Sequence, residues 1–294
     1  VKFLIHFPTC SMTTGLRIDI TALNPEYMNA KLSYIPKRTE KPRESGLNMV
    51  MDKGLSLRQT EDFIELNADR TDLLKLGFGT SLITPNLKEK VKLYLDAGIE
   101  VYCGGTLFEA FYIRKSVDDY LRFIDDLGIG CLEVSDGSMV IKGEDKCEMI
   151  RKLSANYKVL SEVGSKEAGI LISPNKWTEM MSNELEAGSW KVIAEARESG
   201  NVGIYRPNGT AHTALIRKIL AKVELEDILW ETPKKPQQAW FIQQFGANVN
   251  LGNIGPWDVI PLETLRLGLR GDTFFDFLPE SMSTGLRQEI DPES

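Results

Sequence analysis

Eight short runs of apolar and β-branched residues constrain the fold of this chain more than any other feature. They cover residues 47–52, 73–79, 99–105, 131–137, 158–164, 190–197, 228–233 and 248–254. The segments between them carry apolar residues at helical spacing, as in SLRQTEDFIELNA and SVDDYLRFIDDLG. Strands that alternate with single helices predict right-handed crossovers and a parallel sheet. Eight such units within about 230 residues approach the usual size of a (β/α)8 TIM barrel, about 250 residues.

The competing architecture is an open doubly wound sheet, which normally carries a G-x-G-x-x-G loop after its first strand. The first run of this chain leads into MDKGLS, which has one glycine. We therefore predict an α/β fold with a single (β/α)8 barrel at residues 46–277. An N-terminal arm at residues 1–45, partly irregular and rich in Pro, Lys, Arg and Glu, should precede the barrel, and a tail at residues 278–294 should follow it.

The overall composition argues against several classes of function. The chain has 35 Lys and Arg against 42 Asp and Glu, mixed along its length, so it offers no general basic surface to a nucleic acid. No apolar stretch approaches the roughly 20 residues that span a bilayer, which argues against a membrane partner. The four cysteines are far apart and form no C-x-x-C pair, which argues against a zinc site and a disulfide framework. These features fit a cytoplasmic protein best.

Polar residues stand at the carboxyl end of nearly every predicted strand, where a barrel interior would otherwise hold Val, Ile and Leu. They are Asp52, Lys53, Lys75, Glu133, Asp136, Glu162, Glu195, Arg197, Glu198, Glu231, Asn250 and Asn253. These ends converge on one mouth, where barrels of this class place their active sites. Carboxylates gathered there would repel one another and lose hydration unless cations balance them. Oxygen ligands without a Cys or His cluster suit Mg²⁺, which is therefore the predicted metal.

Each of these residues also has a purely structural interpretation. A single glutamate at a strand end serves as an ion-pair partner at least as often as it serves as a ligand, and the metal prediction depends on several carboxylates together. Arg266 and Arg270 follow the eighth run, where barrels often bind phosphate. The same two arginines are equally consistent with surface charge at the end of a helix.

The motifs at the strand ends resemble those of the phosphosulfolactate synthase family. The similarity covers roughly residues 47 to 277 and depends on LKLGFGTSLI, VYCGGTLFE, LEVSDGS, SEVGSK, EARESGNVGIY, ILWETPKKPQQAWFI, FGANVNLGNI and LETLRLGLRGDTF, in that order. The resemblance implies a (β/α)8 barrel, a homo-oligomer with a trimer as one form, and Mg²⁺-dependent addition of sulfite to phosphoenolpyruvate, giving (2R)-O-phospho-3-sulfolactate. In methanogens this reaction begins coenzyme M synthesis, and in bacteria it supplies sulfolactate or related sulfonates.

The resemblance also implies roles for individual residues. Sulfite attacks C3 of phosphoenolpyruvate, negative charge builds on the substrate carboxylate, and a proton must then reach C2. Lys166 occupies the lysine position of the family motif EVGxK and is the expected proton donor. The expected catalytic set is Lys166, Glu162, Lys75 and Arg197; the metal set is Asp136, Glu162, Glu195 and Glu231; the substrate-binding set is Lys53, Arg197, Glu198, Asn250, Arg266 and Arg270.

Two other functions are compatible with the same scaffold. The family includes plant heat-stress-associated relatives that protect other proteins, but those diverge at the strand-end motifs, whereas this chain has MDKGL, GGTLFE, SDGS and EVGSK. A related Mg²⁺-dependent lyase that joins another nucleophile to phosphoenolpyruvate is the second, because a fold does not determine its chemistry.

Overall fold

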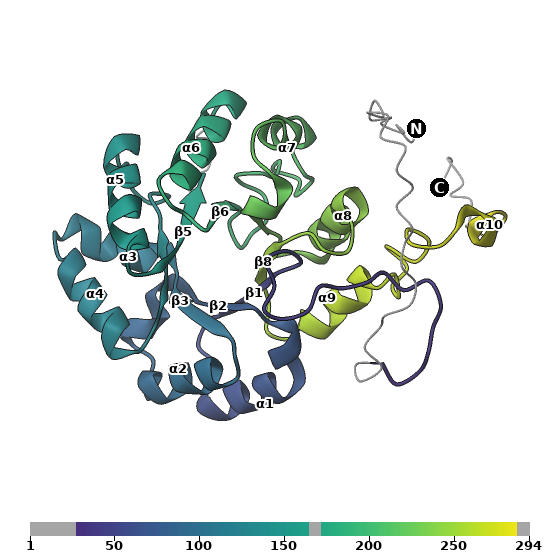
Figure 1. Ribbon diagram of the computed structural model, residues 1–294, viewed down its shortest axis with the longest axis horizontal. Coiled ribbons are helices and arrows are strands. Elements are labelled where there is room, and N and C mark those ends of the chain that lie inside the picture. The colour runs from purple at the N-terminus through teal and green to yellow at the C-terminus, as the bar shows by residue number, and fades with distance from the viewer. Residues whose placement is uncertain (1–27, 165–171, 287–294) are drawn as a thin grey trace.

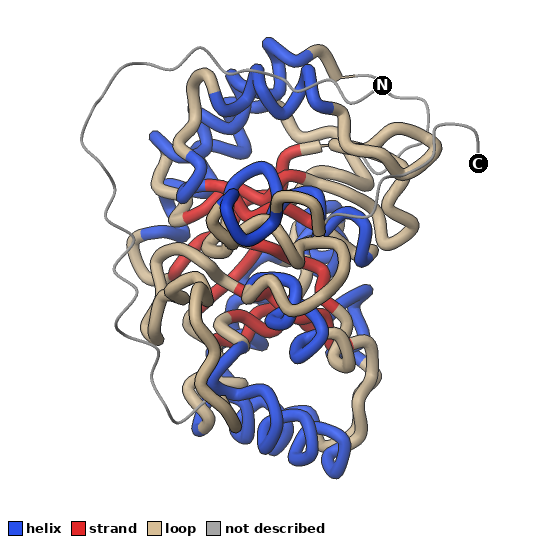
Figure 2. The backbone as a smooth tube through the Cα atoms, turned by 90° about the vertical axis from the view of Figure 1, so that its right-hand side faces the viewer, coloured by secondary structure: helices blue, strands red, loops and turns tan. Residues whose placement is uncertain are grey.

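The computed structural model describes residues 28–164 and 172–286, which form a ring of helices around a central sheet (Figures 1 and 2). The strands are β1 (Asn48–Asp52), β2 (Leu73–Leu76), β3 (Glu100–Cys103), β4 (Cys131–Val134), β5 (Lys158–Val163), β6 (Lys191–Ala194), β7 (Ile228–Glu231) and β8 (Leu251–Ile254). The α-helices are α1 (Leu57–Asn67), α2 (Leu87–Asp96), α3 (Gly105–Ile113), α4 (Val117–Asp126), α5 (Gly143–Ser154), α6 (Pro174–Glu186), α7 (Thr213–Leu220), α8 (Lys235–Phe245), α9 (Val259–Arg266) and α10 (Glu280–Ser283). Short 3-10 helices are η2 (Ala68–Arg70), η3 (Gly77–Leu82) and η4 (Leu225–Asp227).

The eight strands form one sheet in the order β3-β2-β1-β8-β7-β6-β5-β4, and every hydrogen-bonded pair is parallel. The two ends of this order, β3 and β4, also lie in contact, so the sheet closes almost completely on itself. Each predicted apolar run contains one of these strands. The (β/α)8 barrel prediction is therefore confirmed.

The alternation of side chains along the strands builds the floor and the upper layer of the barrel interior. Residues two apart on a strand face the same side. A small cluster of buried, mostly apolar residues fills the lower part of the barrel interior. Five strands each contribute one residue to this cluster and carry a charged residue two positions later, in or just after the strand. The pairs are Leu73 and Lys75, Cys131 and Glu133, Leu160 and Glu162, Ile193 and Glu195, and Leu229 and Glu231. The apolar cluster is thus a floor, and the charged residues lie one layer above it, toward the mouth.

The arm and the tail differ from the barrel in their secondary structure. Residues 28–46 contain no helix or strand, and α10 lies outside the ring of the other helices (Figure 1). The arm nevertheless contacts the barrel, since Arg38 donates to the backbone oxygen of Ala247 at 2.9 Å and pairs with Glu263 on α9 at 3.0 Å. No helix within the described residues has the length and apolar character that a membrane crossing requires.

Candidate active site

One lysine and four glutamates meet in the upper layer of the barrel interior. Lys75 Nζ on β2 lies 3.0 Å from Glu133 Oε2 on β4, 3.3 Å from Glu231 Oε1 on β7 and 3.7 Å from Glu162 Oε2 on β5. Glu195, directly after β6, is the fourth carboxyl group of this layer, and all five side chains are buried. The strands bring these residues together from positions up to 156 apart in the sequence.

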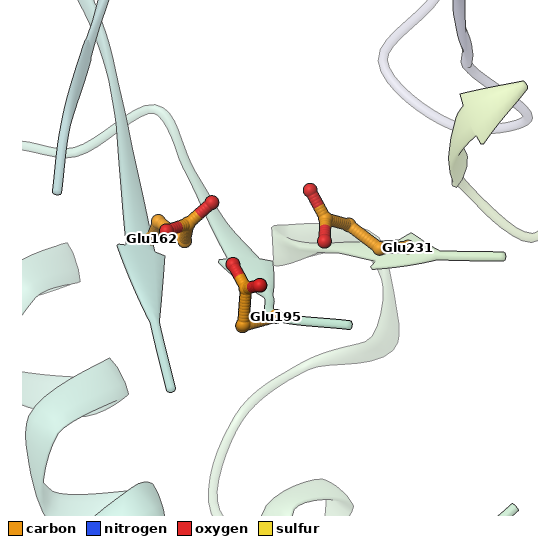
Figure 3. A group of neighbouring side chains, drawn as sticks. All are labelled: Glu162, Glu195 and Glu231. Atoms are coloured by element: carbon orange, nitrogen blue, oxygen red, sulfur yellow. The ribbon is translucent and has the colours of Figure 1, made fainter. Parts of the chain in front are cut away.

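Three of the glutamates converge closely enough to hold a metal ion. Glu162, Glu195 and Glu231 each offer a carboxylate oxygen, and these oxygens all lie within 4.8 Å of one another. Figure 3 shows the three carboxyl groups, carried by β5, the end of β6 and β7, around one shared space. Three oxygen donors of this kind match the preference of Mg²⁺ for carboxylate ligands, so the residues present fit the predicted metal.

The electrostatics of this layer favour an added cation. Burial would lower the pKa of Lys75, but the nearby groups together, with Glu133 and Glu231 foremost, outweigh it and raise the pKa of Lys75 well above its ordinary value. Burial raises the pKa of Glu231 to about 7; Lys75 opposes this rise and Glu162 adds to it. Lys75 therefore stays positive, but its single charge does not balance the surrounding carboxylates, and a divalent cation would complete the balance.

Backbone N–H groups and a hydroxyl hold the glutamates in place. Gly105 N donates to Glu133 Oε1 at 2.7 Å, and Ala196 N donates to Glu231 Oε2 at 2.8 Å. Ser135 Oγ lies 2.9 Å from Glu162 Oε1 as a hydrogen-bond donor. Orienting contacts of this kind are typical of carboxylates that bind ions.

The EVGSK motif needs a glycine because β5 and β6 pack closely at this position. Gly164 has φ of +149°, and a Cβ at this position would lie 2.3 Å from Glu195 Cβ. Any larger residue would push Glu195 away from the other two glutamates. Gly164 is thus required by the spacing of the carboxylates, independently of any contact with a ligand.

A cavity of about 440 Å³ opens above this layer, within the size range of about 300–1,000 Å³ that is common for small-molecule sites. Six predicted site residues line it: Lys75, Glu162, Glu195, Arg197, Glu198 and Glu231. A seventh, Lys53, lies at the mouth after β1 and forms an ion pair with Glu198. Lys166, the expected proton donor, lies outside the described residues.

The group of three converging glutamates does not include Asp136. Asp136 Oδ1 lies 2.8 Å from Lys146 Nζ, and the same ammonium group lies 2.8 Å from Glu184 Oε1 on α6. Lys146 also donates to the backbone oxygen of Glu162 at 2.7 Å. Asp136 therefore takes part in a buried contact between the β4–α5 loop and α5, which corrects the expectation that it lies beside the three glutamates.

Asn250 also lies away from the mouth. Its Nδ2 donates to the backbone oxygens of Glu226 at 2.8 Å and Ile228 at 3.2 Å, and its Oδ1 accepts from Leu47 N at 3.0 Å. These partners lie at the amino ends of β1 and β7, because Asn250 precedes β8 and the mouth lies at the other end. The expected substrate contact of Asn250 is therefore corrected to a structural one.

Arg266 also lies at this opposite end of the barrel. Arg266 is completely buried and donates to Ala247 O at 2.6 Å, Val249 O at 2.8 Å and Asn48 Oδ1 at 2.9 Å. These contacts fasten the last turn of α9 beneath β1 and β8. Arg270 follows that turn and does not line the cavity. A two-turn helix leads the chain away from the mouth, so the expected phosphate contact of Arg266 is corrected, while that of Arg270 stays a prediction.

Two further glutamates of this region, Glu133 and Glu109, had no predicted role in the site. Glu133 was recognised as a strand-end residue, and it is the closest carboxylate to Lys75. Glu109 on α3 is buried beside Ser135, although it does not belong to any strand. One sequence signal could have found it, since Glu109 is the single charged residue of GTLFEAFYI. A carboxylate in an otherwise uncharged helix requires a specific partner.

The fold and the cavity define the protein as an enzyme of the (β/α)8 class, with its site at the carboxyl ends of the strands. Comparison with known proteins then identifies the family. The (2R)-phospho-3-sulfolactate synthase family model matches residues 36–272. The chain therefore belongs to the phosphosulfolactate synthase family, and the resemblance drawn from its motifs is confirmed.

Curated relatives named phosphosulfolactate synthase agree with this assignment. The protein of Bacillus subtilis is 41% identical over 251 residues, which are 84% of this chain and 100% of the relative. That of Methanothermobacter thermautotrophicus is 40% identical over 84% of this chain and 98% of the relative. Among solved structures, 3-hexulose-6-phosphate synthase from Salmonella typhimurium aligns with a TM-score of 0.49 and 12% identity, over 76% of this chain and 100% of that one.

Proposed function

We propose that this protein adds sulfite to phosphoenolpyruvate and forms (2R)-O-phospho-3-sulfolactate with the help of Mg²⁺. The observation that carries the proposal is the group of Glu162, Glu195 and Glu231, whose oxygens lie within 4.8 Å of one another in the cavity of a phosphosulfolactate synthase family member. Phosphoenolpyruvate and sulfite are anions, and a cavity floor of glutamates binds anions well only when cations lie between them.

The three glutamates would hold the ion, and two of them, Glu162 and Glu231, are held in place by neighbouring groups. Lys75 lies between Glu231 and Glu162, Ala196 N–H orients Glu231, and the Ser135 hydroxyl orients Glu162. Mg²⁺ bound there supplies Lewis-acid stabilisation of the negative charge that the substrate carboxylate gains during the addition.

The reaction itself requires one bond-forming step and one proton. The sulfur lone pair of sulfite forms a bond to C3, the C2–C3 π electrons move toward C2 and the carboxylate, and a proton then binds C2. Arg197, exposed at the rim of the cavity, is proposed to bind the anionic groups of the substrates. Lys166, which follows β5 by three residues, is proposed to donate the proton to C2.

Phosphorus NMR of the purified protein with phosphoenolpyruvate and sulfite tests this function. Phosphosulfolactate should form with Mg²⁺, and its formation should stop when EDTA removes the ion and resume when Mg²⁺ is restored. A folded, Mg²⁺-binding protein that makes no product would refute the proposal. Consumption of phosphoenolpyruvate with another small nucleophile in place of sulfite would assign the same site to a different lyase.

A further inference from the structure

A buried row of side chains leads from α3 through Ser135 to Glu162 at the predicted metal site, and Glu109, at its α3 end, has no role in the reaction described above. Glu109 on α3 is 3% exposed, and its Oε2 accepts a hydrogen bond from Ser138 N at 3.1 Å. Its Oε1 contacts the hydroxyl of Ser135, and the same hydroxyl lies 2.9 Å from Glu162 Oε1. Glu109 and Glu162 therefore meet on opposite sides of one serine.

The hydrogen bonds around Ser135 determine where its proton can point. Gly137 N donates to Ser135 Oγ at 3.3 Å, so one lone pair of the hydroxyl oxygen is already used. The hydroxyl also lies within hydrogen-bonding distance of two carboxylate oxygens, one from Glu109 and one from Glu162. The hydroxyl carries one proton, which serves one acceptor at a time, so the two glutamates share it.

We propose that Glu109 and Ser135 are positioning residues, which hold the carboxylate of Glu162 in the orientation that binds the divalent ion. A carboxylate is costly to bury on a helix such as α3, whose other residues carry no charge, so its position needs a compensating contact. Glu109 has that contact in the loop from Ser135 to Ser138, and Ser138 in turn lines the cavity. The inference depends on the proposed function, because it assumes that Glu162 is a ligand.

The hydrogen bonds among Glu109, Ser135 and Glu162 predict different results for three substitutions. Ser135→Ala removes the hydroxyl that orients Glu162. Glu109→Ala removes both contacts, to Ser135 Oγ and Ser138 N, that hold the loop carrying this hydroxyl in place. Glu109→Gln instead introduces an amide N–H₂ that can donate to Ser135 Oγ, which leaves the serine proton to Glu162, while the amide oxygen still accepts from Ser138 N. The conservative variant should therefore retain the orientation that the alanine variant loses.

Binding of Mn²⁺, an observable substitute for Mg²⁺, measures this effect directly. Titration followed by electron paramagnetic resonance should show dissociation constants about 10- to 100-fold higher for Ser135→Ala and Glu109→Ala than for the unmodified chain. Glu109→Gln should stay within a few-fold of it. Turnover in Ser135→Ala should recover as Mg²⁺ is raised, because the site is weakened and not removed.

Two control variants separate the possible failures. Ser189→Ala removes another buried hydroxyl, which donates to Ser161 Oγ at 2.8 Å outside the cavity, and it should bind Mn²⁺ normally. Glu162→Gln should lose binding. If Glu162→Gln binds Mn²⁺ as tightly as the unmodified chain, the metal site itself is wrong and this inference falls with it. If Glu162→Gln loses binding but Ser135→Ala and Glu109→Ala do not, only the positioning role is wrong.

Discussion

Lys75 on β2 and Glu231 on β7 meet across the interior of the barrel, with Nζ 3.3 Å from Oε1. Their contact connects strands that are not neighbours in the sheet, since β1 and β8 lie between them. Lys75 thereby holds two of the three predicted ligands, Glu162 and Glu231, and lies 3.0 Å from Glu133. The stability of the upper layer and its capacity to bind an ion thus depend on the same ammonium group.

Replacement of Lys75 by methionine should destabilise the fold. Lys75→Met leaves buried carboxylates without their common partner, a change that typically lowers the free energy of unfolding by about 3–5 kcal/mol. Saturating Mg²⁺ should restore part of the lost unfolding free energy, because the ion supplies positive charge to the same oxygens. Urea denaturation with and without Mg²⁺ measures both effects.

A matched control for this variant is Lys92→Met. Lys92 pairs with Asp96 on the exposed face of α2, so its loss should cost less than about 0.5 kcal/mol. Equal unfolding free energies for Lys75→Met and Lys92→Met would contradict the proposed charge balance.

Gly105→Ala should damage the site through sterics alone. A Cβ at Gly105 would lie 2.3 Å from Ser135 Cβ and 2.4 Å from Glu133 Oε1, so both side chains would have to move. Because Ser135 orients Glu162, we expect Mn²⁺ affinity to fall by about 10- to 100-fold. Gly130→Ala, where an added Cβ meets nothing within 4 Å, is the control. Unchanged Mn²⁺ binding in Gly105→Ala would show that the packing around Glu133 and Ser135 is less strict than described.

Arg266→Met separates a structural role from a substrate role. Its guanidinium donates to the buried oxygens of Val249 and Asn48, so the variant should lose at least about 2 kcal/mol of unfolding free energy, at about 1–3 kcal/mol for each oxygen left without this donor. The KM for phosphoenolpyruvate should not change in the protein that remains folded. A raised KM with normal stability would contradict the structural role and indicate that Arg266 binds the substrate phosphate.

Arg197→Ala should have the opposite effects. Arg197 is exposed at the rim of the cavity, so its removal should leave the melting temperature nearly unchanged. The KM for sulfite or phosphoenolpyruvate should rise by about 10-fold or more, because a charge-assisted contact to an anion is lost. Arg58→Ala, an exposed arginine on α1, serves as the control. Identical kinetics in the two variants would exclude Arg197 from substrate binding.

Lys166→Ala tests the remaining proposal about the chemistry. The variant should lose turnover while it keeps its thermal stability and its affinity for Mn²⁺, because a proton donor is not needed to bind the ion. Activity close to that of the unmodified chain would contradict the assignment, and lost Mn²⁺ binding would give Lys166 a different role.

The barrel and the convergence of its glutamates could be predicted because both follow from local periodicity. Leu229 and Glu231 are two residues apart on one strand, and the same spacing recurs for Leu160 and Glu162. A period of two places each glutamate on the inner face directly above an apolar residue. The number of strands and their parallel order then bring the carboxyl groups to one end.

The contacts that could not be predicted depend on side chains of other structural elements. Asp136 resembles a ligand in the sequence, but its position is determined by Lys146, which lies on the following helix. Arg266 lies in the eighth βα unit, as phosphate-binding residues often do, but the length of α9 carries it to the opposite end of the barrel. Glu109 lies on a helix and not at a strand end, so reasoning from strand ends did not reach it.

The most direct test of the account is the position of a bound ion. Crystals grown with Mn²⁺ should show an anomalous-scattering peak among the carboxylates of Glu162, Glu195 and Glu231. That result would establish the cation site on which the proposed addition of sulfite depends. A peak at Asp136 and Glu184, or no peak in the cavity from crystals of protein that binds Mn²⁺ in solution, would contradict it.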